Sequence, residues 1–308
     1  MKFFLGSFIY IMYKVKILNK YGEVFFYQHL CLPEFRAQLR ELKSKSSFLA
    51  IGASYLDKPV GLIVAEILPN NRLAKIRSLF VTSAHRGQGV GTLLLTSLEK
   101  ELVVRGCTKA EFFYELDIIK KSISTKLAAL FEKCHWSLIN VDLIYSSNFK
   151  KIYQSAFIHK ENLLPSDMQI FPWKEITTQE KLVIKQTQKA NCWIEEGLNP
   201  FKYDKKNESL NSLGLRYRGE VVGWMLTERV AVDTISYNCM FVRKDLQKMG
   251  RGIALFIEAI KRQKEANIPN GIWFVNQKNH LMIRFVKKYM YSYLTSIKEE
   301  RVYSKLLL

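Results

Sequence analysis

Two glycine-rich segments with the same pattern, residues 86–91 and 247–252, lie 161 residues apart (247 minus 86), and this repeat constrains the fold more than any other feature. The first segment reads RGQGVG and the second QKMGRG. Each follows an apolar run and precedes apolar residues at helical spacing. The chain is therefore predicted to be an internal duplication, in which each half contains the order strand, turn and helix.

The glycines of these segments predict an anion-binding turn. A helix N-terminus exposes unpaired backbone N–H groups and the positive end of the helix dipole, and both attract phosphate. Glycine adopts positive φ angles and lets the backbone approach an anion closely. Other phosphate-binding patterns fit less well, because a dinucleotide fingerprint needs glycine where Thr92 and Ile253 stand, and neither segment has the Gly-Lys-Ser/Thr of a P-loop.

The pattern resembles the signature of the GCN5-related N-acetyltransferase (GNAT) superfamily, which is Arg or Gln, two residues, Gly, one residue, and Gly or Ala. Both segments match at every defined position, namely Arg86, Gly89, Gly91, Gln247, Gly250 and Gly252. In that family the turn amides hold the pyrophosphate of coenzyme A. The resemblance covers most of residues 50–147 and 212–305, and it implies acetyl-CoA or another acyl-CoA as donor, with no metal.

The resemblance implies coenzyme A contacts at both turns and at the strand ends before them. In the first half the expected contacts are Phe80, Val81, Arg86, Gly87, Gln88, Gly89, Val90, Gly91 and Thr92. In the second half they are Phe241, Val242, Gln247, Gly250, Arg251, Gly252 and Asn279. A free backbone N–H near the end of each strand would stabilise the tetrahedral oxyanion. We expect the first half to hold the donor because its turn is the more typical, although Asn279 is the more typical asparagine and Ser124 stands in its place in the first half.

The implied chemistry is attack of a neutral amine on a thioester. A lysine-type amine has a pKa near 10.4, so about one molecule in 2,500 is neutral at pH 7, which costs about 4.6 kcal/mol. A general base offsets part of that cost. The candidates are Glu66 and Glu228, each an ionisable group in an apolar strand next to the expected cleft, and the alternative for both is a carboxylate on a solvent-facing edge.

The tyrosine that often protonates the leaving thiolate in this family is missing from both halves. Phe131 and Val286 stand at its position. Tyr114 and His135 are the candidate substitutes, and a role in the core is the alternative for each. A thiol pKa of about 8.5 also makes the thiolate a tolerable leaving group without an acid.

Composition fits two domains of ordinary size, because the chain has 308 residues, of which 48% are hydrophobic and 24% charged. A polar stretch with a proline at residues 160–167 suggests the boundary. We expect an α+β (mixed α/β) fold of two consecutive GNAT-like domains, residues 1–160 and 161–308. Each is expected to be a mostly antiparallel sheet flanked by helices.

Charge and cysteine usage bear on partners and compartment. The net charge of +19 fits a lysine-rich solvated surface, steering of anionic coenzyme A, or attraction to an acidic peptide or nucleic-acid partner. The sequence has no tandem finger, recognition-helix pattern or Arg-rich arm, so we do not favour a nucleic-acid partner. Five cysteines without a CxxC pair indicate a reduced, cytoplasmic protein, and the scattered histidines give no metal site. The apolar run at residues 3–13 is too short to span a membrane, so we read it as the lead-in to a first strand.

These observations predict an acyl-CoA-dependent N-acyltransferase, with acetyl as the first choice of acyl group. The acceptor would be a primary amine on a small molecule or a peptide. A fatty-acyl transferase acting on a peptide lysine is one alternative, and a catalytically silent acyl-CoA sensor or binding adaptor is another. The acceptor and the oligomeric state stay open.

Overall fold

The computed structural model describes residues 13–42, 47–68, 72–117, 122–159, 164–204, 206–247 and 250–307. The chain forms two compact units. Unit 1 comprises residues 1–141 and 299–308, and unit 2 comprises residues 142–298. The division therefore lies near residue 141 rather than at the expected residue 160, and residues 299–308 belong to the first unit rather than the second.

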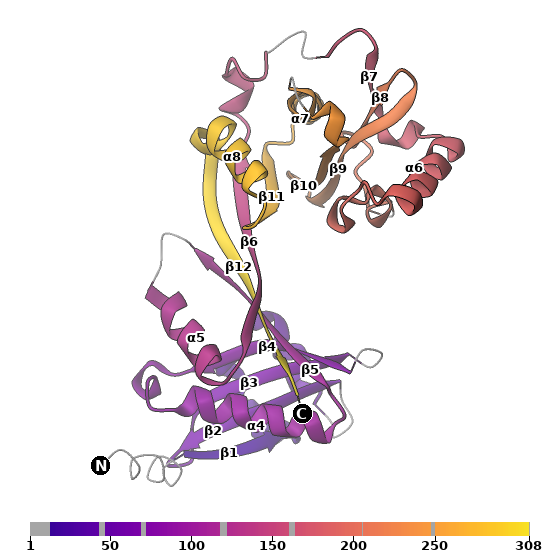
Figure 1. Cartoon of the computed structure of the whole chain (residues 1–308). Coiled ribbons are helices and arrows are strands. Elements are labelled where there is room, and N and C mark those ends of the chain that lie inside the picture. The colour runs from indigo at the N-terminus through magenta and orange to yellow at the C-terminus, as the bar shows by residue number, and fades with distance from the viewer. Residues whose placement is uncertain are drawn as a thin grey trace. The chain divides into compact units, whose positions relative to one another are not determined.

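Unit 1 is a sheet with helices on both faces (Figure 1). Its strands have the order β1-β2-β3-β4-β5-β12, and all printed pairs are antiparallel except β4 with β5, which is parallel. The elements are β1 (Tyr13–Leu18), α2 (Tyr21–Tyr27), α3 (Arg36–Arg40), β2 (Phe48–Tyr55), β3 (Lys58–Leu68), β4 (Leu73–Val81), α4 (Val90–Val104), β5 (Lys109–Asp117), α5 (Ser122–Lys133), and parts of β6 (Ser137–Asn148) and β12 (Leu294–Leu306).

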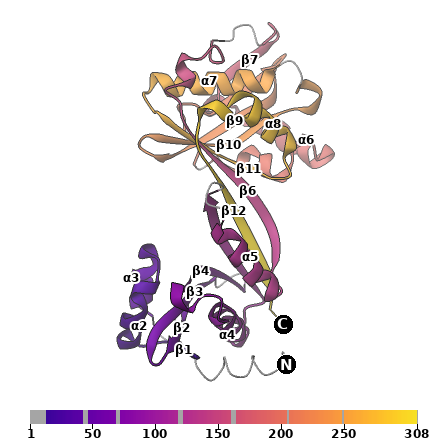
Figure 2. The ribbon, with the colours of Figure 1, turned by 90° about the vertical axis from the view of Figure 1, so that its left-hand side faces the viewer.

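Alternation along β3 builds a core on each face of this sheet. Ile63 and Ala65 face the apolar side of α4, including Leu94 and Leu98. Leu62 and its neighbours on the same face pack with the residues of α2 and α3 instead. Figure 2 shows α4 and the pair α2 and α3 on opposite sides of the strands. The mostly antiparallel sheet flanked by helices is as expected.

Unit 2 repeats this plan with the strand order β6-β11-β10-β9-β8-β7, and β10 with β11 is its parallel pair. Its elements are the second part of β6, β7 (Met168–Pro172), α6 (Thr178–Asn191), β8 (Leu213–Tyr217), β9 (Glu220–Ala231), β10 (Thr234–Val242), α7 (Arg251–Glu265), β11 (Asn270–Asn276), α8 (His280–Tyr289) and the start of β12. The strand, turn and helix of each repeated segment are thus β4 with α4 and β10 with α7.

The part of β12 that belongs to unit 1 is built into its core. Tyr303 is buried, and its ring stacks 5.0 Å from Phe131 and 6.1 Å from Tyr114 between centroids. Lys305 Nζ lies 2.7 Å from Glu99 Oε2 and 2.7 Å from the carbonyl oxygen of Cys134. Residues from the end of the sequence therefore complete the first unit.

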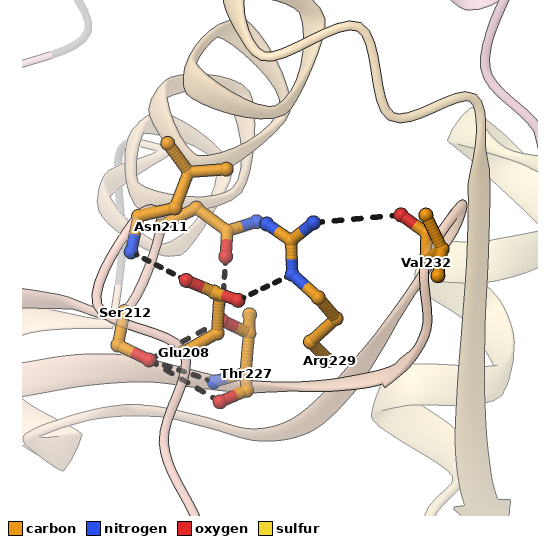
Figure 3. A network of polar contacts seen from close by, with 7 residues as sticks. Glu208, Asn211, Ser212, Thr227, Arg229 and Val232 are labelled. Atoms are coloured by element: carbon orange, nitrogen blue, oxygen red, sulfur yellow. Dashed lines mark hydrogen bonds and ion pairs between the residues drawn. The ribbon is translucent and has the colours of Figure 1, made fainter.

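A buried polar network fixes the segment before β8 to strand β9 in unit 2 (Figure 3). The Thr227 hydroxyl donates to Asn211 Oδ1 at 2.6 Å, and the Thr227 amide donates to Ser212 Oγ at 3.1 Å. Arg229 Nε donates to Glu208 Oε2 at 2.7 Å. The residues on both sides of Glu228 are anchored in this way, so the network holds that stretch of β9 in place.

No helix among the described residues combines the length and the hydrophobicity that a membrane span requires.

Candidate functional site

The two repeated turns have the same backbone geometry. Helix α4 begins after Gly89 at φ 87°, and α7 begins after Gly250 at φ 82°. Glycine has no side chain that could cap a helix, so neither Gly89 nor Gly250 binds the N–H groups in the first turn of the helix that follows it. This geometry fits an anion held by main-chain amides, and both turns therefore suit the diphosphate of coenzyme A. Residues 248–249 of the second turn lie outside the described residues.

The first residue of each repeated segment ties its turn to the preceding strand. Arg86 Nε donates to the carbonyl oxygen of Val81 at 2.8 Å. Gln247 Nε2 donates to the carbonyl oxygen of Val242 at 2.9 Å. Because Arg and Gln both carry a donor that reaches five residues back, this contact explains why either residue suits the position.

The second glycine of each turn meets a different neighbour. A Cβ at Gly91 would lie 3.1 Å from Leu130 Cδ2 on α5, which is tighter than ordinary contact. A Cβ at Gly252 would lie 3.9 Å from its nearest atoms, on Met240 and Val242. At Gly91, helix packing therefore also favours the absence of a side chain, in addition to the close approach of a phosphate that we expect at both glycines.

The residues between the glycines also differ. Val90 is buried in the core of unit 1, so its expected contact with coenzyme A can involve only its backbone. Arg251 stands at the matching position, and its Nη1 donates to the carbonyl oxygen of Leu246 at 3.0 Å. Its buried Nε has no hydrogen-bond partner among the described residues. A cation is unfavourable at a helix N-terminus, so Arg251 fits a turn that binds an anion.

Tyr13 on β1 fixes the turn of unit 1 through a directional chain of hydrogen bonds. Gln88 Nε2 donates to the carbonyl oxygen of Ala84 at 2.9 Å, which leaves Gln88 Oε1 as an acceptor. The Tyr13 hydroxyl donates its one proton to that oxygen. His85 Nδ1 lies 2.9 Å from the same hydroxyl and completes the chain.

Tyr13→Phe should therefore weaken coenzyme A binding by unit 1 about fivefold, because the half-buried His85 and the exposed Gln88 lose their partner at a cost of about 1 kcal/mol. Titration calorimetry with coenzyme A measures this effect. Tyr55→Phe is the matched control, since Tyr55 also packs on His85, with ring centroids 5.1 Å apart. Equal affinities for both variants would show that the hydroxyl of Tyr13 does not hold the turn.

The strand before each turn separates from its parallel neighbour. The pairing of β4 with β5 runs only from Leu73 with Lys109 to Ile76 with Phe112. The pairing of β10 with β11 ends at Ser236 with Ile272. β4 and β10 continue beyond these pairs to Val81 and Val242, so the strands diverge towards the turns.

A cavity of about 130 Å³ lies where β10 and β11 diverge in unit 2. Its lining is mostly apolar and includes Met240, Met282 and Phe285. Asn238 and Asn279 supply polar groups. Asn279 Oδ1 accepts from the amide of Met282 at 3.0 Å and so caps α8, which fixes this asparagine at the cavity. Side chains 122–125, including that of Ser124, lie outside the described residues.

The two candidate bases have different partners at equivalent positions. Glu66 is bound by Arg77, whose Nε lies 2.8 Å from Oε2. Glu228 Oε2 accepts from Asn238 Nδ2 at 3.1 Å, and its other oxygen lies 3.7 Å from the exposed Lys206 Nζ. Arg77 thus holds the Glu66 carboxylate in a close ion pair, whereas Glu228 has a neutral amide donor and a longer ion pair with an exposed lysine.

The candidate acids do not join Glu66 in one site. Glu66 pairs with Phe48, which packs on the core beneath α2 and α3. Tyr114 packs on the opposite core with Phe112, and burial raises the pKa of Tyr114 to about 12. A phenol with that pKa is a poor proton donor to a thiolate. His135 is exposed at φ 60° in the turn after α5. Both expectations of an acid role thus lack support from the geometry.

The remaining expected contacts lie at the strand ends. Phe80 is partly exposed, with the guanidinium carbon of Arg86 5.5 Å from its ring centroid. Phe241 is buried instead, and its ring stacks on Trp224 with centroids 4.6 Å apart. Phe131 and Val286 are both buried core residues, so neither position offers a polar group.

Comparisons with known proteins agree with this arrangement. Residues 15–136 match the model of the acetyltransferase (GNAT) family. A tandem GNAT protein from the clavulanic acid biosynthesis pathway superposes with a TM-score of 0.56 at 10% identity, covering 96% of this chain and 99% of that one. A GCN5-related N-acetyltransferase from Sphaerobacter thermophilus gives a TM-score of 0.57 at 12% identity, covering 96% of both chains.

A third solved structure is a glucosamine N-acetyltransferase region of a fungal multi-domain GH3 β-N-acetylglucosaminidase. It has a TM-score of 0.55 and 16% identity, and the match covers 95% of this chain and 38% of that one. A search of curated protein sequences gives no match. Residues 15–136 are thus similar to the GNAT family, and the chain as a whole has the fold of the tandem GNAT structures.

Proposed function

We propose that this protein transfers an acetyl group from acetyl-CoA to a primary amine, and that unit 2 carries out the reaction. The observation that carries this proposal is the combination found in unit 2. A turn suited to a diphosphate, an apolar cavity between diverging strands, and a carboxylate bonded to a cavity residue all belong to that one unit.

Each part of unit 2 has a defined task in this proposal. The amides after Gly250 bind the diphosphate, and the cavity takes the pantetheine arm and its thioester. The amine nitrogen attacks the thioester carbonyl carbon, and Glu228 accepts the amine proton directly or through a water molecule. The carbon–sulfur bond then breaks, and the thiolate leaves without a protein acid, which its pKa of about 8.5 permits.

Unit 1 is proposed as a second coenzyme A site with little or no catalysis. It carries the segment that matches the family model, and its turn keeps the same geometry. Its candidate base is engaged by Arg77 in a close ion pair, however, and Tyr114 is held in an aromatic stack. We expected the first half to hold the donor. The proposal keeps donor binding in unit 1 but assigns the acetyl-transfer reaction to unit 2.

A silent acyl-CoA sensor is the alternative that a specific observation favours. Phe131 and Val286 bury apolar side chains where the family's acid stands. A fatty-acyl donor is favoured by the apolar lining of the cavity. Release of free thiol from acetyl-CoA and from palmitoyl-CoA, measured over a panel of amines, separates these functions.

Gly250→Ala is expected to weaken coenzyme A binding by unit 2 about tenfold. Alanine is strained at a φ of 82°, so the turn must move and its amides lose alignment with the diphosphate. Gly219→Ala is the matched control, because Gly219 has φ 84° and open space around its Cβ position in the β8–β9 turn. Calorimetric titration with coenzyme A compares the two.

The same comparison applies to unit 1. Gly89→Ala changes the turn at φ 87°, and Gly106→Ala imposes a similar strain at φ 81° near the other end of α4. If all four variants bind coenzyme A like the unchanged protein, neither turn holds the diphosphate, and the proposed donor site is wrong.

A further inference from the structure

Helix α8 has two chemically different faces. Met282 and Phe285 line the cavity of unit 2, and Val286 is buried. The other face is exposed and basic, and we name it the α8 surface. It consists of His280, Leu281, Arg284, Lys287, Lys288 and the nearby Tyr291, all exposed. The sequence from residue 276 to residue 298 contains no aspartate or glutamate.

The cations of the α8 surface have no acidic partner. Among the described residues, no carboxylate forms an ion pair with Arg284, Lys287 or Lys288. Other arginines of unit 2 do have such partners: Arg216 lies 2.6 Å from Glu180, and Arg229 lies 2.7 Å from Glu208. Arg284 differs in this respect from these two arginines, whereas lysines without a carboxylate partner also occur elsewhere in the described part of the unit.

The spacing of these cations places them side by side. Residues three and four positions apart share one face of a helix, with Cβ atoms about 5–6 Å from each other. Arg284, Lys287 and Lys288 have this spacing, and like charges at such distances repel each other. A bound polyanion removes that repulsion and releases its own counterions, so the α8 surface favours a row of phosphates.

An exposed aromatic ring indicates which kind of polyanion fits the α8 surface. Tyr291 is 63% exposed and follows α8 directly. A nucleobase can stack on such a ring, whereas an acidic peptide has no bases to place there. Leu281 is 68% exposed, but one leucine offers far less apolar surface than the acyl chains that hold proteins on a bilayer.

We propose that the α8 surface docks a single-stranded nucleic acid, with phosphates on Arg284, Lys287 and Lys288 and a base on Tyr291. The sequence lacks the finger, recognition-helix and Arg-rich patterns, so we did not favour a nucleic-acid partner, but helix α8 presents cations and an aromatic ring that could bind one. The binding does not depend on acetyl transfer. Because the other face of α8 lines the cavity, a strand bound to the α8 surface would lie beside the proposed site.

The experiment measures the fluorescence anisotropy of a labelled, mixed-sequence, single-stranded RNA 20-mer titrated with the full chain. A DNA of the same sequence distinguishes the two nucleic acids. The triple variant Arg284→Gln, Lys287→Gln, Lys288→Gln should bind at least tenfold more weakly. Its plot of log affinity against log salt should be shallower by about 2, which corresponds to three lost phosphate contacts.

The matched control removes the same charge elsewhere in unit 2, through Lys150→Gln, Lys151→Gln and Lys174→Gln, which are all exposed positions. It should bind within threefold of the unchanged protein. Tyr291→Ala should weaken binding about tenfold without changing the salt dependence. Thermal unfolding checks that every variant is folded.

The proposal fails if the two triple variants bind RNA and DNA alike, since net charge alone would then explain the binding. It also fails if polyglutamate or vesicles of anionic phospholipid bind as tightly as the oligonucleotides and Tyr291→Ala has no effect. Those results would assign the α8 surface to an acidic protein or to a membrane.

Discussion

Replacing Tyr303 by alanine is expected to lower the free energy of unfolding of unit 1 by about 3–5 kcal/mol, the usual cost of removing a large aromatic side chain from a core. Tyr303 is buried and stacks on both Phe131 and Tyr114, so the lost ring leaves a cavity among aromatic side chains. Thermal unfolding combined with hydrogen exchange measures the effect, and exchange should accelerate in α4, α5 and β5.

Leu306→Ala is the control for this experiment. Leu306 belongs to the same strand but is 72% exposed, so its truncation should change stability by less than about 0.5 kcal/mol. If Tyr303→Ala and Leu306→Ala have equal, small effects, residues 299–308 do not form part of the core of unit 1.

Glu228→Gln is expected to reduce kcat for acetyl transfer by a factor of about 10²–10⁴, the range that a general base contributes. Glutamine keeps the size of the side chain and its contact with Asn238 but cannot take the amine proton. The affinity for coenzyme A should stay unchanged, because Glu228 takes no part in the turn. Steady-state release of free thiol, measured beside calorimetry, separates the two effects.

Glu66→Gln is the matched variant in the other unit. We expect it to change kcat less than twofold, since Arg77 holds the Glu66 carboxylate in a close ion pair. A large loss with Glu66→Gln and none with Glu228→Gln would assign the chemistry to unit 1. Thiol release at background for the unchanged protein, with coenzyme A still bound, would favour the sensor.

The features that the sequence predicted correctly are local. The two glycine turns set a left-handed residue before each helix, and the apolar spacing after them fixes α4 and α7. The duplication follows because the same local pattern occurs twice. The polar stretch at residues 160–167 does not coincide with the division of the two compact units near residue 141, since composition cannot show which sheet a distant strand joins.

The features that the sequence did not reveal depend on contacts between distant residues. Asn238 bonds Glu228 at a register shift between β9 and β10, and no sequence pattern marks that irregularity. Tyr13 reaches Gln88 across 75 positions. The packing of Gly91 against Leu130 depends on the position of α5, which no local pattern shows.

The membership of residues 299–308 in unit 1 also fixes when this protein can acquire its native form. At the ribosome, residues 142–298 must be made before the missing strand of the first unit emerges, a delay of roughly 8–30 s at ordinary elongation rates. The first unit therefore cannot complete its fold before the second unit is synthesised, although an N-terminal domain usually folds first. Until residues 299–308 emerge, strand β5 has an unpaired edge, and chaperones are most needed at that stage.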